Sequence, residues 1–171
     1  QDGLLTTVAD DSGRSVSYEY VDGNLSVYRD AGGGEWHYGY DADHRLVSVT
    51  KPRGNTVVTN TYDSLGRVVT QVDGEGNPTR LRHGGRENVV EAADGAVRRF
   101  LLDLAGRLAA QQDPAGNHAG RTHDAQGDLT AVTDRLGETT GFGYDDASGR
   151  VGSIQDPEGN LTQFTSYDLM G

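Results

Sequence analysis

A tandem repeat of about 21 residues runs through the sequence and constrains its fold more than any other feature. A Tyr-Asp pair, or a variant of it, marks each repeat, and the first residues of these pairs lie 19 to 23 residues apart. These first residues, here called the Tyr column, are Tyr20, Tyr40, Tyr62, His83, Leu102, His123, Tyr144 and Tyr167. A unit this short cannot bury a core alone, so its stability has to come from neighbouring units.

Two turn signals divide each repeat into segments of strand length. The first, Asp-x-x-Gly, directly follows the Tyr column, as at 63–66 and 103–106, and Arg comes next in both. The second is Asp-Pro-x-Gly-Asn, as at 113–117 and 156–160. Asp bonds to its own backbone two residues on, Pro presets φ and Gly adopts positive φ. The segments between the turns, of about five or six residues, are rich in residues that favour strands.

The segment before each Tyr-column residue alternates in the manner of a strand, so that Trp36, Tyr38 and Tyr40 share one face. Stacked hairpins would align such residues into an aromatic ladder. On the following segment Leu46 and Val49 are three residues apart, which indicates either two half-buried faces or a β-bulge. No apolar stripe of helical period lasts ten residues, so no helix is expected.

The sequence therefore predicts an all-β fold of about eight antiparallel hairpins in tandem, which form a curled ribbon of about sixteen strands. The repeat array is expected to fill residues 1–171 and to be truncated at both ends. Its two end strands would then be open edges, through which the chain could self-associate.

Composition excludes several classes of function. The net charge is −11, so nucleic acid and anionic membrane surfaces are poor partners. No apolar run approaches the ~18 residues of a membrane span. The chain has no Cys, which excludes disulfides, thiolate metal sites and Cys nucleophiles.

Candidate chemical groups follow the repeat and are interpreted mainly as scaffold. The acid pairs at 10–11 and 145–146 are interpreted as turn residues, and none of the five His has a partner at metal-ligand spacing. Binding of Ca²⁺ by the acidic turns stays open. Stacking of a sugar on Trp36, Tyr38 and Tyr40 is the alternative to packing between hairpins. No catalytic, cofactor or metal residue is assigned, and no enzyme activity is expected.

With its tandem Tyr-Asp, Gly-Arg-Leu and Asp-Pro-x-Gly-Asn columns, nearly the whole chain resembles the YD-repeat or Rhs-repeat family. That family includes bacterial Rhs and wall-associated polymorphic toxins, the C component of insecticidal toxin complexes, and teneurins. The resemblance implies a segment of a hollow β-shell that encloses and helps to deliver a C-terminal toxin domain. The partners would be other repeats and that domain, and the location secreted or on the bacterial surface. Adhesion to a cell-surface receptor or glycan is the alternative.

Overall fold

The computed structural model of the chain describes residues 3–145 and 147–167. In these ranges every regular element is a β-strand, which confirms the all-β prediction. The strands follow one another through the sheet in chain order, and successive strands form antiparallel hairpins. Asp146 and Asp168, which complete an acid pair and the last Tyr-Asp pair in the sequence, lie outside the described residues.

The chain divides into two compact units. The first runs to Arg82 and includes Glu91–Gly95, and the second comprises His83–Val90 and the residues from Ala96 onward. The first eight strands are β1 (Thr7–Ala9), β2 (Ser15–Val21), β3 (Asn24–Arg29), β4 (Glu35–Tyr40), β5 (Leu46–Thr50), β6 (Thr56–Tyr62), β7 (Val68–Asp73) and β8 (Pro78–His83). The others are β9 (Glu87–Glu91), β10 (Val97–Leu102), β11 (Leu108–Gln112), β12 (His118–His123), β13 (Leu129–Thr133), β14 (Thr139–Tyr144), β15 (Val151–Gln155) and β16 (Leu161–Gln163).

The turns that follow the Tyr column, here called inner turns, have the chemistry that the sequence predicts. In the turn 63–67, Asp63 Oδ1 accepts hydrogen bonds from the backbone N–H groups of Leu65 at 2.9 Å and Arg67 at 3.0 Å. Gly66 has a φ of 76°, a region that strains residues with a Cβ atom. The Asp and the Gly therefore fix the turn locally, before any contact with another repeat.

The turns at the other end of the hairpins, here called outer turns, repeat this pattern. Asp73 Oδ1 accepts from the backbone N–H groups of Glu75 and Asn77, both at 2.9 Å, and Gly76 has a φ of 89°. The Asn77 side chain donates to Asp73 Oδ2 at 3.0 Å. The two turn signals of the sequence thus build one type of turn, which ends in Arg in the inner turn 63–67 and in Asn in the outer turn 73–77.

Most of the hairpins that the inner turns close have a β-bulge on the strand that pairs with the Tyr-column strand. In the pair β4–β5, Tyr38 lies opposite Val49 and Tyr40 lies opposite Leu46, so Val47 is the extra residue. The same shift occurs in the pairs β2–β3, β6–β7, β10–β11, β12–β13 and β14–β15. The bulge places Leu46 and Val49 opposite residues of one face, which decides between the two interpretations that the sequence left open.

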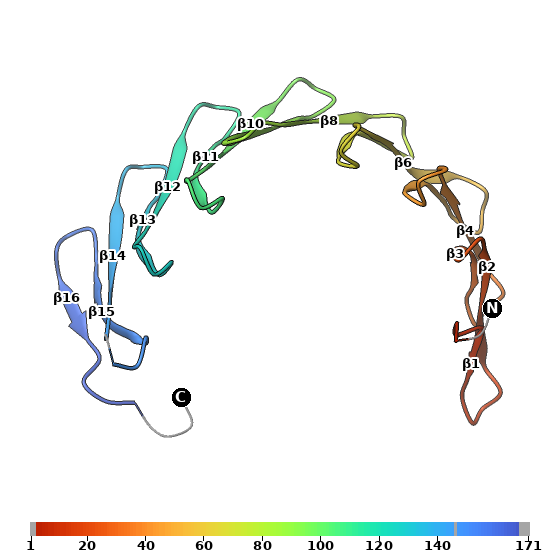
Figure 1. Ribbon diagram of the computed structural model, residues 1–171, viewed down its shortest axis with the longest axis horizontal. Helices are drawn as coiled ribbons and strands as arrows, with labels where there is room; N and C mark the ends of the chain where they lie inside the picture. Colours follow the sequence, from red (N-terminus) through yellow and green to blue (C-terminus); the bar gives the residue numbers. More distant parts are fainter. Residues whose placement is uncertain (1–2, 146, 168–171) are drawn as a thin grey trace. The chain divides into compact units, whose positions relative to one another are not determined.

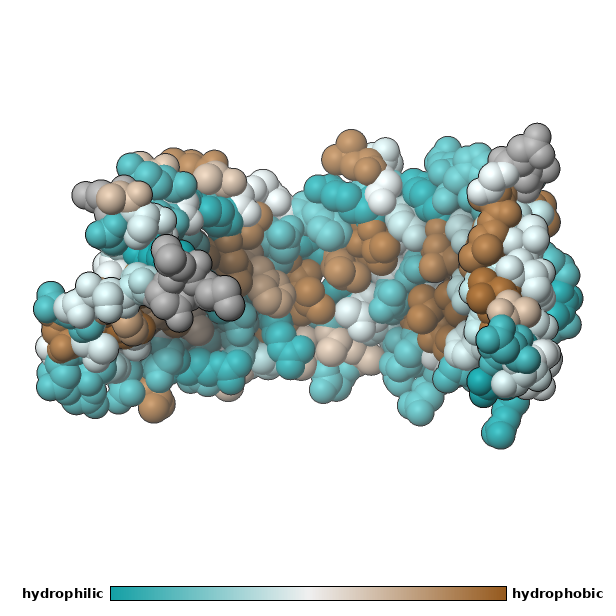
Figure 2. All heavy atoms as spheres, turned by 90° about the horizontal axis from the view of Figure 1, so that it is seen from below, coloured by the Kyte–Doolittle hydropathy of each residue, from teal (hydrophilic) through white to brown (hydrophobic). Residues whose placement is uncertain are grey.

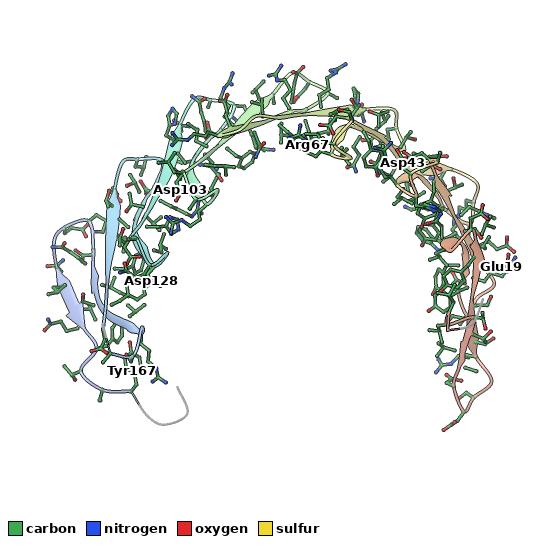
Figure 3. All side chains as sticks on the ribbon, in the orientation of Figure 1. Glu19, Asp43, Arg67, Asp103, Asp128 and Tyr167 are labelled. Carbon is green, nitrogen blue, oxygen red and sulfur yellow. The ribbon has the colours of Figure 1, made fainter. Side chains whose placement is uncertain are left out.

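Each unit is a single curved layer of strands, with the inner turns bent over its concave side and outer turns projecting from its convex side (Figure 1). Asp43, Arg67 and Asp103, all from inner turns, lie on the concave side (Figure 3). Among the described residues only Val89 and Asn60 are buried, with 6% and 8% of their surface exposed. Because the layer encloses no core, it depends on contacts between adjacent strands.

Apolar side chains form a band along the concave face of each unit (Figure 2). The rings of Tyr18 and Tyr28 lie side by side there, with centroids 5.4 Å apart. Tyr28 in turn lies opposite Trp36, so β2, β3 and β4 carry a short run of facing aromatic residues. In the later hairpins the facing partner of an aromatic residue is not aromatic, as with Phe142 opposite Ile154. The structure therefore limits the predicted aromatic ladder to strands β2, β3 and β4, because the second strand of each later hairpin contributes no aromatic residue.

Candidate functional site at the concave face

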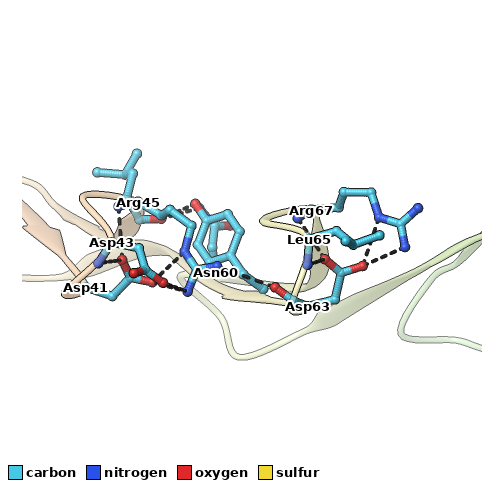
Figure 4. A network of polar contacts seen from close by, with 9 residues as sticks. Asp41, Asp43, Arg45, Asn60, Asp63, Leu65 and Arg67 are labelled. Atoms are coloured by element: carbon cyan, nitrogen blue, oxygen red, sulfur yellow. Dashed lines mark hydrogen bonds and ion pairs between the residues drawn. The ribbon is translucent and has the colours of Figure 1, made fainter.

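The side chain of Arg45 folds back onto the inner turn 41–45 and bonds to its first residue, Asp41 (Figure 4). Its Nε donates to Asp41 Oδ2 at 2.8 Å, and its guanidinium also lies 3.1 Å from Asp43 Oδ2. The hydrogen bond from the Arg45 side chain holds the pKa of the Asp41 carboxyl below its ordinary value, and the Arg45 backbone N–H adds to this effect. The guanidinium of Arg45 therefore serves as the counter-ion of the carboxylates in its own turn.

Arg45 also contacts the next repeat. Its guanidinium carbon lies 4.9 Å from the centre of the Tyr62 ring, and its Nη1 donates to the Asp63 carbonyl at 3.4 Å. In return, the Tyr62 hydroxyl donates to the Leu46 carbonyl at 2.6 Å. A cation over an aromatic face is attracted by the ring quadrupole, so these contacts hold two successive inner turns together.

Both contacts recur along the chain. The Arg107 guanidinium donates to the carbonyl of Asp124 at 3.4 Å, and the Arg150 guanidinium lies 5.0 Å from the centre of the Tyr167 ring. The other hydroxyl-to-carbonyl pairs are Tyr20 with Leu5, Tyr144 with Leu129 and Tyr167 with Val151. The Tyr and Arg columns therefore act as the links between repeats.

Asn60 takes a position that is aromatic or apolar in most other repeats, and it is almost fully buried. Its Nδ2 donates to the Leu46 carbonyl at 3.1 Å, and its Oδ1 accepts from Gln71 Nε2 at 3.0 Å. The Leu46 carbonyl thus accepts from both Asn60 and Tyr62. These hydrogen bonds satisfy a polar side chain that would otherwise be costly to bury.

The three aromatic residues that the sequence suggested for sugar stacking do not all lie at one site. Tyr38 and Tyr40 line a hollow of about 650 Å³ on the concave face, together with Asn24, Asp41 and other residues of the neighbouring turns, but Trp36 does not line it. Burial raises the pKa of the Tyr40 phenol, and Tyr38 adds a smaller upward effect. Two of the three proposed residues are therefore brought together beside polar groups.

Several of the acidic and His residues have structural contacts. Asp10 and Asp145 accept backbone hydrogen bonds within their turns, as their interpretation as turn residues predicts. His44 has a φ of 61°, in the position that Gly occupies in other inner turns, and its Nδ1 lies 2.8 Å from Asn24 Nδ2. In the ranges that the structure describes, no group of three or more His, Cys, Asp or Glu is placed to hold a metal ion.

The sequence shows an Arg column but does not indicate its role. The signal was available, because Gly-Arg follows the same period as the Tyr column. The contact of Arg45 with Tyr62 spans nearly one repeat, however, so it follows only from the strand register. Within residues 3–145 and 147–167, no helix is long and apolar enough to cross a membrane.

Chain-ordered hairpins, a bulge opposite the Tyr column and Arg–Tyr contacts between successive inner turns define an array of linked β-hairpin repeats. The family model described as RHS Repeat matches residues 21–56 and 123–161. Toxin protein Tse5 of Pseudomonas aeruginosa is 34% identical over 137 residues, which cover 73% of this chain and 10% of that protein. The chain belongs to the RHS-repeat family.

Solved structures share the fold at low sequence identity. The Photorhabdus luminescens Tc holotoxin pore matches with a TM-score of 0.69 and 14% identity, over 90% of this chain and 10% of that one. A TcdB2-TccC3 crystal structure matches with a TM-score of 0.69 and 15% identity, also over 90% of this chain and 10% of that one. This chain thus spans about a tenth of the length of the relatives that it matches.

Proposed function

We propose that this chain is a segment of an RHS-repeat shell that encloses a toxin polypeptide and helps to deliver it. The observation that carries the proposal is a single layer of strands with two different faces. The concave face carries an apolar band (Figure 2), whereas charged side chains such as Glu19 lie on the convex face (Figure 3). Membership of the RHS-repeat family and the toxin names of its relatives support the choice of a toxin as the enclosed chain.

The convex face is polar in strands β2 to β4. Arg29 donates to Glu35 at 2.7 Å and also pairs with Glu19, which lies on the convex side in Figure 3. His37 Nε2 lies 3.5 Å from Glu35. Since successive residues of a strand point to opposite faces, these groups alternate with the aromatic residues of the concave band. This arrangement suits a wall with water outside and a guest chain inside.

The apolar band suits an extended polypeptide better than a compact substrate. Its side chains are mostly half-buried, so each retains apolar surface that a guest can cover, at about 25 cal/mol per Å². The contact is spread over many strands, which gives weak and sequence-tolerant binding. A toxin held in this way acts outside the cell that makes it, so we expect the protein to be secreted or on the bacterial surface.

The repeats are proposed to act through stability and not through catalysis. The test is protease protection of the toxin domain in an RHS-repeat toxin that contains this segment. Replacing Tyr62 and Tyr144 together by Ala removes two links between repeats and should make the toxin domain accessible to protease. The control Glu158→Gln changes an exposed outer turn and should leave protection intact.

Two results would contradict this assignment. One is a toxin domain that is equally protease-sensitive in the unmodified protein and in the double variant. The other is loss of toxin activity in Glu158→Gln at an unchanged melting temperature, because that would place chemistry in the repeats. The toxin domain expressed alone should keep its activity.

A glycan-binding module is the second candidate, favoured by the hollow at Tyr38 and Tyr40. Aromatic rings beside the amide of Asn24 and the carboxylate of Asp41 are groups that stack on and hydrogen-bond to sugars. Titration with a panel of neutral oligosaccharides tests this, with Tyr40→Ala as the variant and Tyr144→Ala as its control. Binding that only Tyr40→Ala abolishes would establish this function, and no binding to any oligosaccharide would reject it.

A further inference from the structure

A cationic group interrupts the apolar band in the second unit. The residue two before the Tyr column lies on the same face of its strand as the Tyr column. In β2, β4, β6, β8, β10, β12 and β14 this residue is Tyr18, Tyr38, Asn60, Leu81, Phe100, Arg121 and Phe142. Arg121 is the only charged member of this set, and the Tyr-column residue beside it on β12 is His123.

Arg121 lines a hollow of about 480 Å³ on this face. The hollow is formed by the residue before β9, the inner turn 103–107, β11 and β12. Its principal lining residues are Arg86, Asp103, Arg107, Ala109, Arg121 and His123. Ala109 contributes only a short side chain to the lining, where β5 has the larger Val47 at the equivalent position.

The positive charge of the hollow exceeds its internal counter-charge. Arg107 Nε donates to Asp103 Oδ2 at 2.7 Å, so this pair is neutral together. Arg86 Nε donates to the carbonyl of Leu102 at 3.3 Å, which fixes its position without a counter-ion. Among the described residues, the Arg121 guanidinium has no hydrogen-bond or ion-pair partner. Arg86 and Arg121 therefore leave a local excess of positive charge in a chain with a net charge of −11.

We propose that this hollow binds a carboxylate side chain of the enclosed polypeptide. A guanidinium is a planar fork of donors that matches a carboxylate, and Arg121 is half-buried, where such a bond is stronger than in open water. The guest chain thus has an acidic residue at this point between apolar stretches that cover the band. The identity of the guest rests on the proposed function, whereas the anion-binding site itself does not.

The test is binding of a fluorescein-labelled hexaglutamate peptide to this chain, followed by fluorescence anisotropy, with hexaglutamine as the neutral comparison. Hexaglutamate should bind and hexaglutamine should not. Arg121→Gln should weaken binding about tenfold, the size of one charge-assisted hydrogen bond. Arg121→Lys keeps the charge but loses the fork, so its effect should be smaller. The control Arg53→Gln removes the same charge from an exposed outer turn and should change affinity less than about twofold.

Equal weakening by Arg121→Gln and Arg53→Gln would overturn the proposal, because binding would then follow net charge alone. Displacement of hexaglutamate by an equal concentration of inorganic phosphate would assign the hollow to a small anion instead. Circular dichroism of each variant shows whether the fold is kept. A protease-sensitive toxin domain would refute the shell but leave the peptide result unchanged, so the two proposals fail separately.

Discussion

Replacing Tyr62 by Phe removes one hydroxyl group and leaves the aromatic ring under Arg45. That hydroxyl donates to the Leu46 carbonyl at 2.6 Å. A neutral hydrogen bond contributes about 0.5–1.5 kcal/mol to the free energy of unfolding. Because Asn60 also donates to this carbonyl, at 3.1 Å, the acceptor keeps a partner. We therefore expect Tyr62→Phe to lower the free energy of unfolding by about 0.5–1 kcal/mol.

The shared acceptor makes this prediction sharper in a double-mutant cycle. Asn60→Ala removes the second donor to the Leu46 carbonyl and also the oxygen that accepts from Gln71. By itself this replacement should lower the free energy of unfolding by about 1–2 kcal/mol. With both replacements the Leu46 carbonyl loses both side-chain donors. The double variant should therefore lose about 0.5–1 kcal/mol more free energy of unfolding than the two single variants lose together.

Urea unfolding measures these losses, with the fluorescence of Trp36 as the reporter, because it is the only Trp and lies in the same unit as Tyr62. The control is Tyr38→Phe, since the Tyr38 hydroxyl has no hydrogen-bond partner among the described residues. This control should change the free energy of unfolding by less than about 0.5 kcal/mol. A loss in Tyr62→Phe no larger than in Tyr38→Phe, or strict additivity in the cycle, would refute the reasoning.

Three further predictions concern the turns and the sheet edges. Gly66→Val should lower the free energy of unfolding by about 1–3 kcal/mol, because Gly66 has a φ of 76°, which strains a β-branched residue. The control Ala105→Val, in another inner turn, should not have this effect, and urea unfolding measures both variants. Hydrogen bonds from Arg67 lower the pKa of Asp63 in the folded chain. The ionised carboxylate therefore stabilises this turn at pH values above the pKa of Asp in the unfolded chain, about 3.9. The urea midpoint should therefore fall as the pH drops below about 4, and less so in Asp63→Asn. The exposed end strands β1 and β16 should pair between copies, and a strictly monomeric chain in sedimentation at high concentration would reject this.

The fold was predictable because its information is local and repeated. The Asp and Gly of the turn 63–67 act within five residues, and the same chemistry returns in every repeat that keeps them. The period then dictates that successive hairpins stack in chain order, as observed. Even degenerate turns such as Asp22-Gly23, with φ values of 50° and 82°, keep the positive φ that a tight hairpin requires.

Features that depend on register were not predictable to the same degree. The spacing of Leu46 and Val49 fitted two arrangements, and the bulge at Val47 decided between them only once the partner strand was known. The contact of Arg45 with Tyr62 has the same origin, since it joins residues nearly one repeat apart. Sequence periodicity shows that an Arg column and a Tyr column exist, but it does not show which Arg contacts which Tyr.

Departures from the repeat are the places where a specific function can be located in such an array, because the regular columns are already explained by the links between hairpins. In the sequence, His123 departs visibly from the Tyr column, whereas Arg121 does not stand out, since a single Arg in a strand is ordinary. Only the fold brings Arg86 and Arg107 to the same hollow as Arg121, from positions up to 35 residues apart in the sequence. The informative departures in a repeat protein are therefore those that meet in space. By that criterion the cationic hollow of the second unit is a stronger candidate for guest recognition than the more conspicuous aromatic run at β4.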